Sequence, residues 1–332
     1  GIVANVHDLT SAEGSASEAG LLLGSDGKLY GTCASGGSAS LLGTVMRFDP
    51  VALTVTALRT LGVGDGFYPR DGVVKETIPP SNLVQVNARV MLEGPYNSGT
   101  LIMADALRVL GDFPLTEPYT GLGFTQVGGG GAETTTAPVL AVTGNNAIVD
   151  WVRIELRSSS DPTTILATKQ CLVQRDGDVV STDGVSVVSI SMAPASYYVA
   201  VRHRNHLSVM SSAAIALSAS PTSVDFTLTS TPTFGALAQK TIGTVNMLWA
   251  GNTFRDSPVP WLLKYTGASN DRDPILSAIG GVVPTNTVTG YRVEDVNLDG
   301  VTKYTGASND RDFILANIGG VVPTNTKTDQ LP

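Results

Sequence analysis

The C-terminal part of the chain contains a near-identical internal repeat, which constrains the fold more than any other feature. Residues 264–273 recur as residues 303–312, and the match continues to Thr287 and Thr326. Across this stretch 21 of 24 positions agree at a period of 39 residues. Agreement this high predicts that residues 248–332 form one module built from two copies of the same local structure.

The second copy carries a regular series of oxygen-bearing side chains. Asp295, Asn297 and Asp299 stand at alternate positions, and Gly300 follows them directly. This is the pattern of the first half of an EF-hand-type calcium loop, whose seventh position, here Val301, offers a backbone carbonyl. Because calcium prefers many hard oxygen ligands, the pattern predicts a Ca²⁺ site in this copy.

The acid that should close this loop is displaced along the chain. Position 12 of such a loop is normally a carboxylate, but here it is Gly306, and Asp310 and Asp312 follow it. An insertion before the closing acid would place one of these two on the ion. Either acid also favours the start of the predicted helix at residues 313–318, because a helix N-terminus attracts negative charge. The alternative is an Asx-turn with solvated acids and no ion.

The first copy has lost part of the loop pattern. A shift of 39 residues puts Pro258 and Pro260 where the second copy has its asparagine and its second aspartate. Another alignment takes its candidate ligands from Asn252, Asp256, Asp271 and Asp273. Proline fits the first turn of a helix, so Pro274 predicts a helix capped by Asp273 and leaves Asp271 as the better ligand. Whether this copy binds an ion stays open.

Residues 1–80 contain a weaker repeat with a period of 52, in which residues 3–9 align with residues 55–61. Asp26-Gly27 lies between apolar runs, which predicts a hairpin turn with positive φ at both positions. Residues 43–50 read as a strand that ends in a turn. Short strands at this period predict a β-repeat segment.

A Pro-Pro step at residues 78–82 places a domain boundary near residue 80. Residues 81–247 then show alternating strand patterns at 84–92, 148–157, 166–174, 185–192 and 197–202. Strands at this spacing predict a central β-sandwich. The expected fold is therefore mainly β, with an N-terminal β-repeat at 1–80, a sandwich at 81–247 and a duplicated loop-helix module at 248–332.

Residues 202–206 form the densest polar cluster of the middle domain. His203 and His206 could bind a metal, or act as a base with Asp150 or Asp178. The favoured interpretation is structural: the histidines bond the backbone and the arginines pair with carboxylates. No nucleophile or metalloprotease motif occurs in the chain, which indicates a protein that is not an enzyme.

Composition narrows the class of partner. The formal net charge is −8 with 15% charged residues, and an acidic chain without a basic patch argues against nucleic acid. No apolar run is long enough to span a bilayer. The start at Gly1, with no signal peptide, is typical of a mature secreted chain. Cys33 and Cys171 lie far apart in sequence and are expected as free, buried core residues.

Three stretches resemble known secreted proteins. Residues 3–75, with Gly24-Ser25-Asp26-Gly27 and Gly43-Thr44-Val45, resemble a GloVer-type tandem repeat. The two tail loops resemble a dockerin-like pair with an inserted Lys-Tyr-Thr-Gly-Ala-Ser. Residues 82–332, with Val149-Asp150-Trp151 among their motifs, resemble a C-terminal domain of secreted Bacteroidota surface proteins. The resemblance implies a location outside the cell or on its surface, and it implies no known reaction.

These features lead to two expectations of function. The first is an extracellular structural or adhesive protein, stabilised by calcium, whose incomplete N-terminal repeat associates with copies of itself into a filament or surface layer. The alternative is a carbohydrate-binding module that contacts surface glycans through a row of exposed aromatic residues. Trp151, Tyr197 and Tyr119 are the candidates for such a row.

Overall fold

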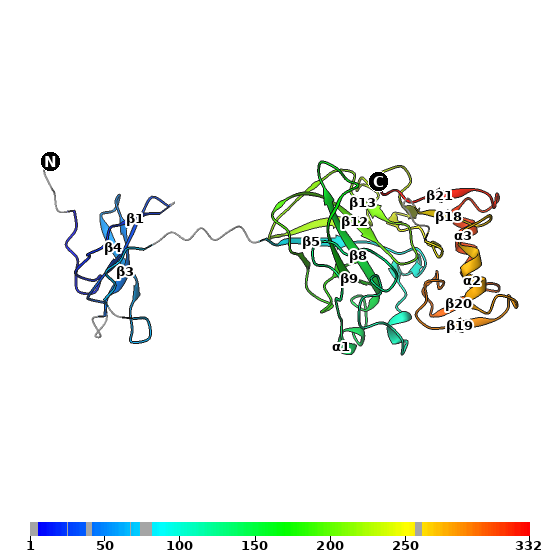
Figure 1. The fold of residues 1–332 in the computed structure, drawn as a ribbon, viewed down its shortest axis with the longest axis horizontal. Coiled ribbons are helices and arrows are strands. Elements are labelled where there is room, and N and C mark those ends of the chain that lie inside the picture. The colour runs from blue at the N-terminus through cyan, green and yellow to red at the C-terminus, as the bar shows by residue number, and fades with distance from the viewer. Residues whose placement is uncertain (1–5, 25, 38–41, 67, 74–81, 256–260) are drawn as a thin grey trace. The chain divides into compact units, whose positions relative to one another are not determined.

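The computed structural model describes residues 6–24, 26–37, 42–66, 68–73, 82–255 and 261–332 (Figure 1). The chain is mainly β, as predicted. It divides into two compact units, residues 1–79 and 80–332. The predicted boundary near residue 80 coincides with this division, whereas the predicted boundary at 247/248 lies inside the second unit.

The first unit is a four-stranded antiparallel meander. Its strands run in the order β1 (Leu22–Leu23), β2 (Leu29–Cys33), β3 (Thr44–Asp49) and β4 (Thr54–Thr60). The predicted hairpin connects β1 to β2, since Leu23 pairs with Leu29. Of Asp26 and Gly27, only Gly27 has a positive φ, 76°, and the Leu23–Leu29 pair encloses more than two residues, so the expected two-residue turn is wrong.

The second unit contains two main sheets. The larger has the order β10-β9-β8-β12-β13 with β14 also paired to β12, and the smaller has the order β11-β5-β15. Their bounds are β5 (Val84–Arg89), β8 (Ile148–Ser158), β9 (Ile165–Gln174), β10 (Val179–Val180), β11 (Val188–Ile190), β12 (Ala195–Arg202), β13 (Val209–Met210), β14 (Ile215–Leu217) and β15 (Pro221–Asp225).

Short elements complete this unit: β6 (Tyr96–Asn97), β7 (Ile102–Met103), η1 (Leu107–Val109), α1 (Ala137–Leu140), β16 (Lys240–Ile242) and β17 (Val245–Met247). One hydrophobic core joins the sheets, because Val86 of β5 and Val188 of β11 cluster with Val152 of β8 and Val199 of β12. Burial of such apolar surface is the main favourable contribution to folding.

The longest strand, β8, is buried on both faces, whereas an alternating strand usually has one exposed face. Its first ten residues, Ile148 to Arg157, are all buried. Val152, Ile154 and Leu156 face the hydrophobic core. The alternate positions carry Arg153, Glu155 and Arg157, which are covered on the other side of the sheet. Burial of these three charged residues on one face requires that they pair with one another.

The tail contains β18 (Leu262–Lys264), α2 (Arg272–Ala278), β19 (Thr287–Thr289), β20 (Val301–Lys303), α3 (Arg311–Asn317) and β21 (Thr326–Thr328). Each copy pairs with the other: β18 pairs with β21, and β20 pairs with β19 in the equivalent register. The hydroxyl of Thr266 donates to Pro323 O at 2.9 Å, and that of Thr305 donates to Pro284 O at 2.8 Å. Each copy therefore makes the same contacts to the other, as expected for two copies related by an approximate twofold axis.

Within the described ranges, no helix is long and apolar enough to cross a membrane. Cys33 and Cys171 are both free and buried, as predicted.

Candidate functional site

The second tail copy brings two buried carboxylates to one loop. Asp295 accepts the backbone N–H of Asp299 at 3.2 Å and that of Gly300 at 2.8 Å. Asp310 accepts the N–H of Val296 at 2.6 Å and that of Lys303 at 2.7 Å. Both side chains are fully buried. Asp310 therefore ties the beginning of the loop to β20, and it lies beside the first residue of the predicted calcium pattern.

Asn297 and Asp299, the other predicted side-chain ligands, add further oxygens to this loop. Asn297 accepts the N–H of Asp299 at 2.9 Å through its side-chain oxygen, and Asp299 accepts the N–H of Val301 at 2.9 Å. Gly300 has a φ of 84°, which permits the sharp bend of the loop. These bonds are Asx-type bonds, as the alternative interpretation expected. They do not exhaust the carboxylates, because each offers about four lone-pair sites.

The electrostatics of the two acids differ from those of solvated aspartates. Burial, with the nearby charge of Asp299 adding to it, raises the pKa of Asp295 to about 6, although Arg204 opposes the shift. Burial and the charge of Asp295 raise the pKa of Asp310 to about 7. Oxygen donors and uncompensated negative charge fit calcium in chemical type. No group of three or more His, Cys, Asp or Glu side chains is arranged to hold a metal in the parts of the chain that the structure describes.

The structure separates the two acids that were candidates to close the loop. The exposed side chain of Asp312 accepts from Asn309 Nδ2 at 2.8 Å and pairs with Arg311 at 3.1 Å, so it turns away from the loop. Asn309 Oδ1 accepts the N–H of Asp312 at 3.0 Å and so caps the helix. Asp310 rather than Asp312 therefore faces the loop, and the binding of an ion by either acid stays a prediction.

The first copy repeats this arrangement in part. Asp271 is buried and accepts the N–H of Lys264 at 2.7 Å and that of Phe254 at 3.0 Å. Asp273 is exposed and bonded to Asn270, so Asp271 is the buried acid of this copy, and the role of either acid as a ligand stays a prediction. The predicted cap is also wrong, because α2 begins at Arg272 and places Asp273 in its first turn.

Two predicted ligands of this copy remain. Asn252 is fully buried, and neither polar atom of its amide has a hydrogen-bond partner within the described ranges. Asp256 lies outside the described residues.

The polar cluster at residues 202–206 is a buried hydrogen-bond network, as the structural interpretation predicted. His203 Nε2 lies 3.0 Å from Asp150 Oδ2, and Arg204 Nε donates to the same oxygen at 2.9 Å. The Tyr291 hydroxyl donates to Asp150 Oδ1 at 2.6 Å. Asp178, the other acid considered, pairs instead with Arg89 at 2.7 Å. Burial raises the pKa of Asp150, but Arg204 and His203 outweigh it and hold the pKa at about 2.

The bonding pattern assigns both histidines as neutral. His206 Nε2 accepts the backbone N–H of Gly94 at 3.1 Å, so its proton lies on Nδ1. That proton faces His203 Nδ1 at 3.0 Å and Asn205 Oδ1 at 2.8 Å. His203 then donates from Nε2 to Asp150. Neither ring has a free nitrogen for catalysis.

This network also holds the segment that leads into the calcium-type loop. Asn205 Nδ2 donates to Val293 O at 2.8 Å and to Asp295 O at 2.7 Å. Arg204 donates to Arg292 O and stacks over Tyr291 at 4.3 Å from the ring centroid. The cluster of the middle domain therefore positions the tail loop, a link that the sequence pattern did not reveal.

Because both histidines are buried and neutral, we expect the fold to lose stability in acid. Burial lowers the pKa of His203, and burial and the charge of Arg204 lower that of His206 well below its usual value. The unfolded chain therefore binds more protons below about pH 6.5, and the free energy of unfolding falls as pH falls below that value. Asp295 and Asp310 act oppositely, because their raised pKa values favour the protonated folded state.

The variant His206→Gln separates the contribution of this histidine to the pH dependence of stability from those of Asp295 and Asp310. It should reduce the loss of stability between pH 6.5 and pH 5 by up to about 1.4 kcal/mol per pH unit, the contribution of one proton. Urea titrations of wild type and variant at several pH values measure this. An unchanged pH dependence would contradict the assignment of His206 as buried and neutral.

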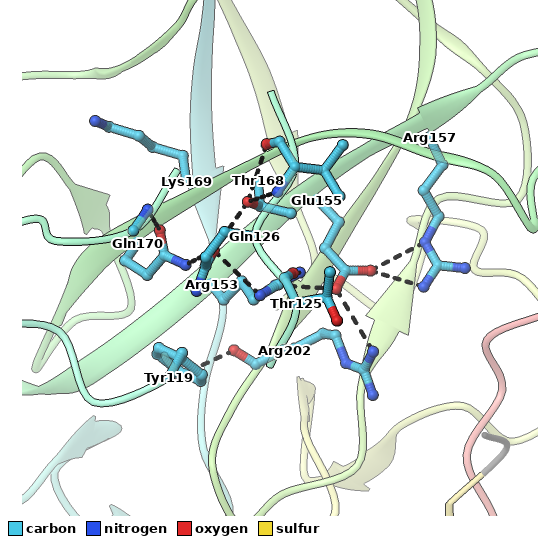
Figure 2. Close-up of polar contacts among 12 residues, drawn as sticks. Tyr119, Thr125, Gln126, Arg153, Glu155, Arg157, Thr168, Lys169, Gln170 and Arg202 are labelled. Atoms are coloured by element: carbon cyan, nitrogen blue, oxygen red, sulfur yellow. Dashed lines mark hydrogen bonds and ion pairs between the residues drawn. The ribbon is translucent and has the colours of Figure 1, made fainter. Parts of the chain in front are cut away.

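A second charged cluster lies on the covered face of β8 and was missed from the sequence (Figure 2). Glu155 is fully buried and pairs with Arg153 at 3.0 Å, Arg157 at 2.7 Å and Arg202 at 3.5 Å. Burial raises the pKa of Glu155, but the three arginines outweigh it and the pKa is lowered. The backbone carbonyl of Thr125 accepts from Arg153 at 2.7 Å. The alternation of Arg153, Glu155 and Arg157 was the available signal.

The carbohydrate-binding candidates do not form an exposed row. Trp151 and Tyr119 are fully buried, and Tyr197 is 5% exposed. The Tyr119 hydroxyl donates to Trp151 O at 2.8 Å, and Trp151 Nε1 donates to Pro114 O at 2.9 Å. All three are core residues, so their assignment to a glycan-binding surface is wrong.

Comparisons with protein families, with curated proteins and with solved structures found no match to this chain. The geometry of the sites therefore carries the functional proposal.

Proposed function

We propose that the chain is a non-catalytic protein of the cell exterior, with a central β-sandwich and a calcium-stabilised, dockerin-like tail. Its role is structural or adhesive, with copies of itself as partners. The observation that carries the proposal is the pair of buried aspartates, Asp295 and Asp310, on one loop. Two buried carboxylates with raised pKa values favour a state in which a cation balances them.

Calcium suits this loop because the donors are hard oxygens of mixed type. Asp295 and Asp310 would supply carboxylate oxygens, Asn297 and Asp299 two further side-chain oxygens, and Val301 its carbonyl. Binding to the folded state alone adds free energy to that state. Lys303 Nζ lies 3.4 Å from Asp299 Oδ2, and calcium would replace this half-exposed contact.

Calcium at one hundred times its dissociation constant should stabilise the second unit by about 2.7 kcal/mol. For a unit of this size that corresponds to a rise in Tm of roughly 5–10 °C. Isothermal titration and thermal melts in calcium and in chelator measure both. Binding should weaken at pH 5, because protons then compete for Asp295 and Asp310.

A matched pair of variants tests the assignment of the closing acid. Asp310→Asn should abolish the calcium-dependent rise in Tm, whereas Asp312→Asn, two residues away and exposed, should retain it. Absence of heat and of any Tm change in millimolar calcium for the wild type would exclude the site.

The non-catalytic part of the proposal rests on the histidine network. His203 and His206 are fully buried, and each ring nitrogen has a partner. Turnover of a polysaccharide or peptide that is lost in His203→Ala would contradict it.

Self-association is the second part of the proposed role, and an observation in the first unit supports it. Strand β4 pairs with β3 and has no partner on its other edge among the described residues. Leu58 on this strand is 47% exposed, and Leu23 on β1 at the opposite edge is 63% exposed. Unpaired edges with exposed apolar residues are prone to pair with another chain. Contact between two different edges would be heterologous and could extend into a filament.

The chain should form multimers in light scattering, whereas a version lacking residues 1–78 should stay monomeric. Leu58→Lys should also reduce the multimers, because a charge on an edge strand opposes pairing. Val282→Lys, at an 85% exposed site in the tail, is the control and should change nothing. If the full chain is monomeric at high concentration with calcium, self-association is wrong.

A further inference from the structure

A cavity of about 340 Å³ lies beside the arginine cluster of the second unit. This volume is at the lower end of the range for small-molecule sites, roughly 300–1,000 Å³. Its charged lining consists of Arg153, Arg202, Arg255 and Glu155. Three cations face one anion, so the lining has two excess positive charges in a chain whose net charge is −8.

Arg202 lines this cavity, and three of its five N–H donors have no partner among the described residues. Its Nη1 lies 3.5 Å from Glu155 Oε1, and its guanidinium stacks over Trp261 at 4.0 Å from the ring centroid. Its Nε and Nη2 are buried and have no hydrogen-bond partner within the described part of the chain. Leaving a buried donor unsatisfied costs about 1–3 kcal/mol. These donors therefore favour occupancy by an acceptor.

The geometry of the unused donors indicates which chemical group can accept from them. The Nε–H and Nη2–H bonds of a guanidinium are parallel and coplanar, so they match the two oxygens of one carboxylate. Among the described residues, no carboxylate other than Glu155 forms an ion pair with Arg202. Asp329 is buried and accepts the N–H of Ser208 at 2.7 Å; burial raises its pKa and the charge of Arg202 opposes that rise, but the two side chains form no ion pair.

Two more features of the lining distinguish a ligand site from a structural ion pair. Arg255 is half-buried, donates to Leu122 O at 3.3 Å, and its Nε also has no partner among the described residues. The ring of Phe124 lies 5.5 Å from the guanidinium carbons of both Arg153 and Arg202. The cavity thus combines charge at its arginines with an apolar wall, as small-molecule sites do.

We propose that this cavity binds a small organic carboxylate of about monosaccharide size, such as a uronic acid. The carboxylate accepts the two parallel bonds from Arg202, Arg255 adds charge beside it, and the body of the ligand lies against Phe124. This role goes beyond calcium binding and self-association and does not depend on either.

Titration of the full chain with sodium D-glucuronate, followed by calorimetry and tryptophan fluorescence, tests the proposal. Glucuronate should bind and should change the emission of Trp261, which stacks on Arg202. D-glucose, which lacks the carboxylate, and sodium sulfate, which is tetrahedral, should bind at least tenfold more weakly. Equal binding of glucose, stronger binding of sulfate, or no binding of glucuronate would overturn the proposal.

Three variants locate the site. Arg202→Lys keeps the charge but loses the paired donors and should lower the affinity for glucuronate at least tenfold. Arg255→Gln, at a half-buried position that is less critical for folding, should also weaken binding several-fold. The control Arg272→Gln removes an arginine that stacks on Tyr265 in the tail and should leave binding unchanged. Wild-type affinity in a folded Arg255→Gln protein would place the ligand elsewhere and contradict the assignment.

Discussion

Replacing Glu155 with glutamine should destabilise the second unit by about 3–5 kcal/mol, the usual cost of removing one partner from a buried ion pair. The neutral side chain leaves Arg153, Arg157 and Arg202 without their shared carboxylate. The first two side chains are at most 3% exposed and that of Arg202 is 7% exposed, so water replaces the lost partner only in part. Repulsion among three buried cations adds to this loss.

Urea unfolding of the chain, followed by tryptophan fluorescence, measures the effect. The control is Asp273→Asn, which breaks an exposed pair with Arg272 at 3.4 Å and should change stability by less than about 1 kcal/mol. A double variant, Glu155→Gln with Arg202→Met, should be less unstable than the sum of the single changes, because it also removes an unpaired charge. A small effect of Glu155→Gln alone would show that the cluster is open to solvent.

The sequence predicted the duplicated tail well, because identical segments form identical local structure. The helix start and the short strands recur at equivalent positions in both copies. It did not predict that β18 pairs with β21 and β19 with β20. Two equal copies can pair within themselves or with each other, and only the packing of the tail decides between these arrangements.

Period-two alternation in β8 identified which residues share a face but not whether that face is covered. An alternating pattern is typical of a strand with one exposed face, which would have left Arg153, Glu155 and Arg157 in solvent. Their cover comes from Phe124 and Thr125, and from Trp261, which is about a hundred residues away along the chain. Contacts between residues so far apart in the sequence cannot be predicted from the periodic pattern of one strand.

The closing acid of the calcium-type loop was ambiguous for a local reason. Asp310 and Asp312 are two residues apart, and both suit a helix N-terminus. The bond from the N–H of Asp312 to Asn309 Oδ1 fixes the helix start and leaves Asp310 facing the loop. Asparagine as a capping residue was the signal that could have distinguished them.

Replacing Asp150 with asparagine should lower the free energy of unfolding by about 3–5 kcal/mol, which is the second large effect that we expect. Asp150 accepts bonds from His203, Arg204, Tyr291 and the N–H of Trp151. The amide of asparagine has one acceptor oxygen for these four donors and adds two donors of its own. Arg204, which is fully buried, then loses the carboxylate to which it donates.

This change should also act on the tail loop, which distinguishes it from a general loss of stability. Arg204 donates to Arg292 O, and Tyr291 bonds Asp150 directly, so the variant loosens the segment that leads to Asp295. Calcium affinity should fall along with stability, and amide exchange at residues 291–300 should rise at denaturant levels far below the unfolding midpoint. The companion Tyr291→Phe removes one bond to a charged group and should cost about 1.5–3 kcal/mol. Unchanged calcium affinity in a folded Asp150→Asn protein would show that the loop is held by its own bonds alone.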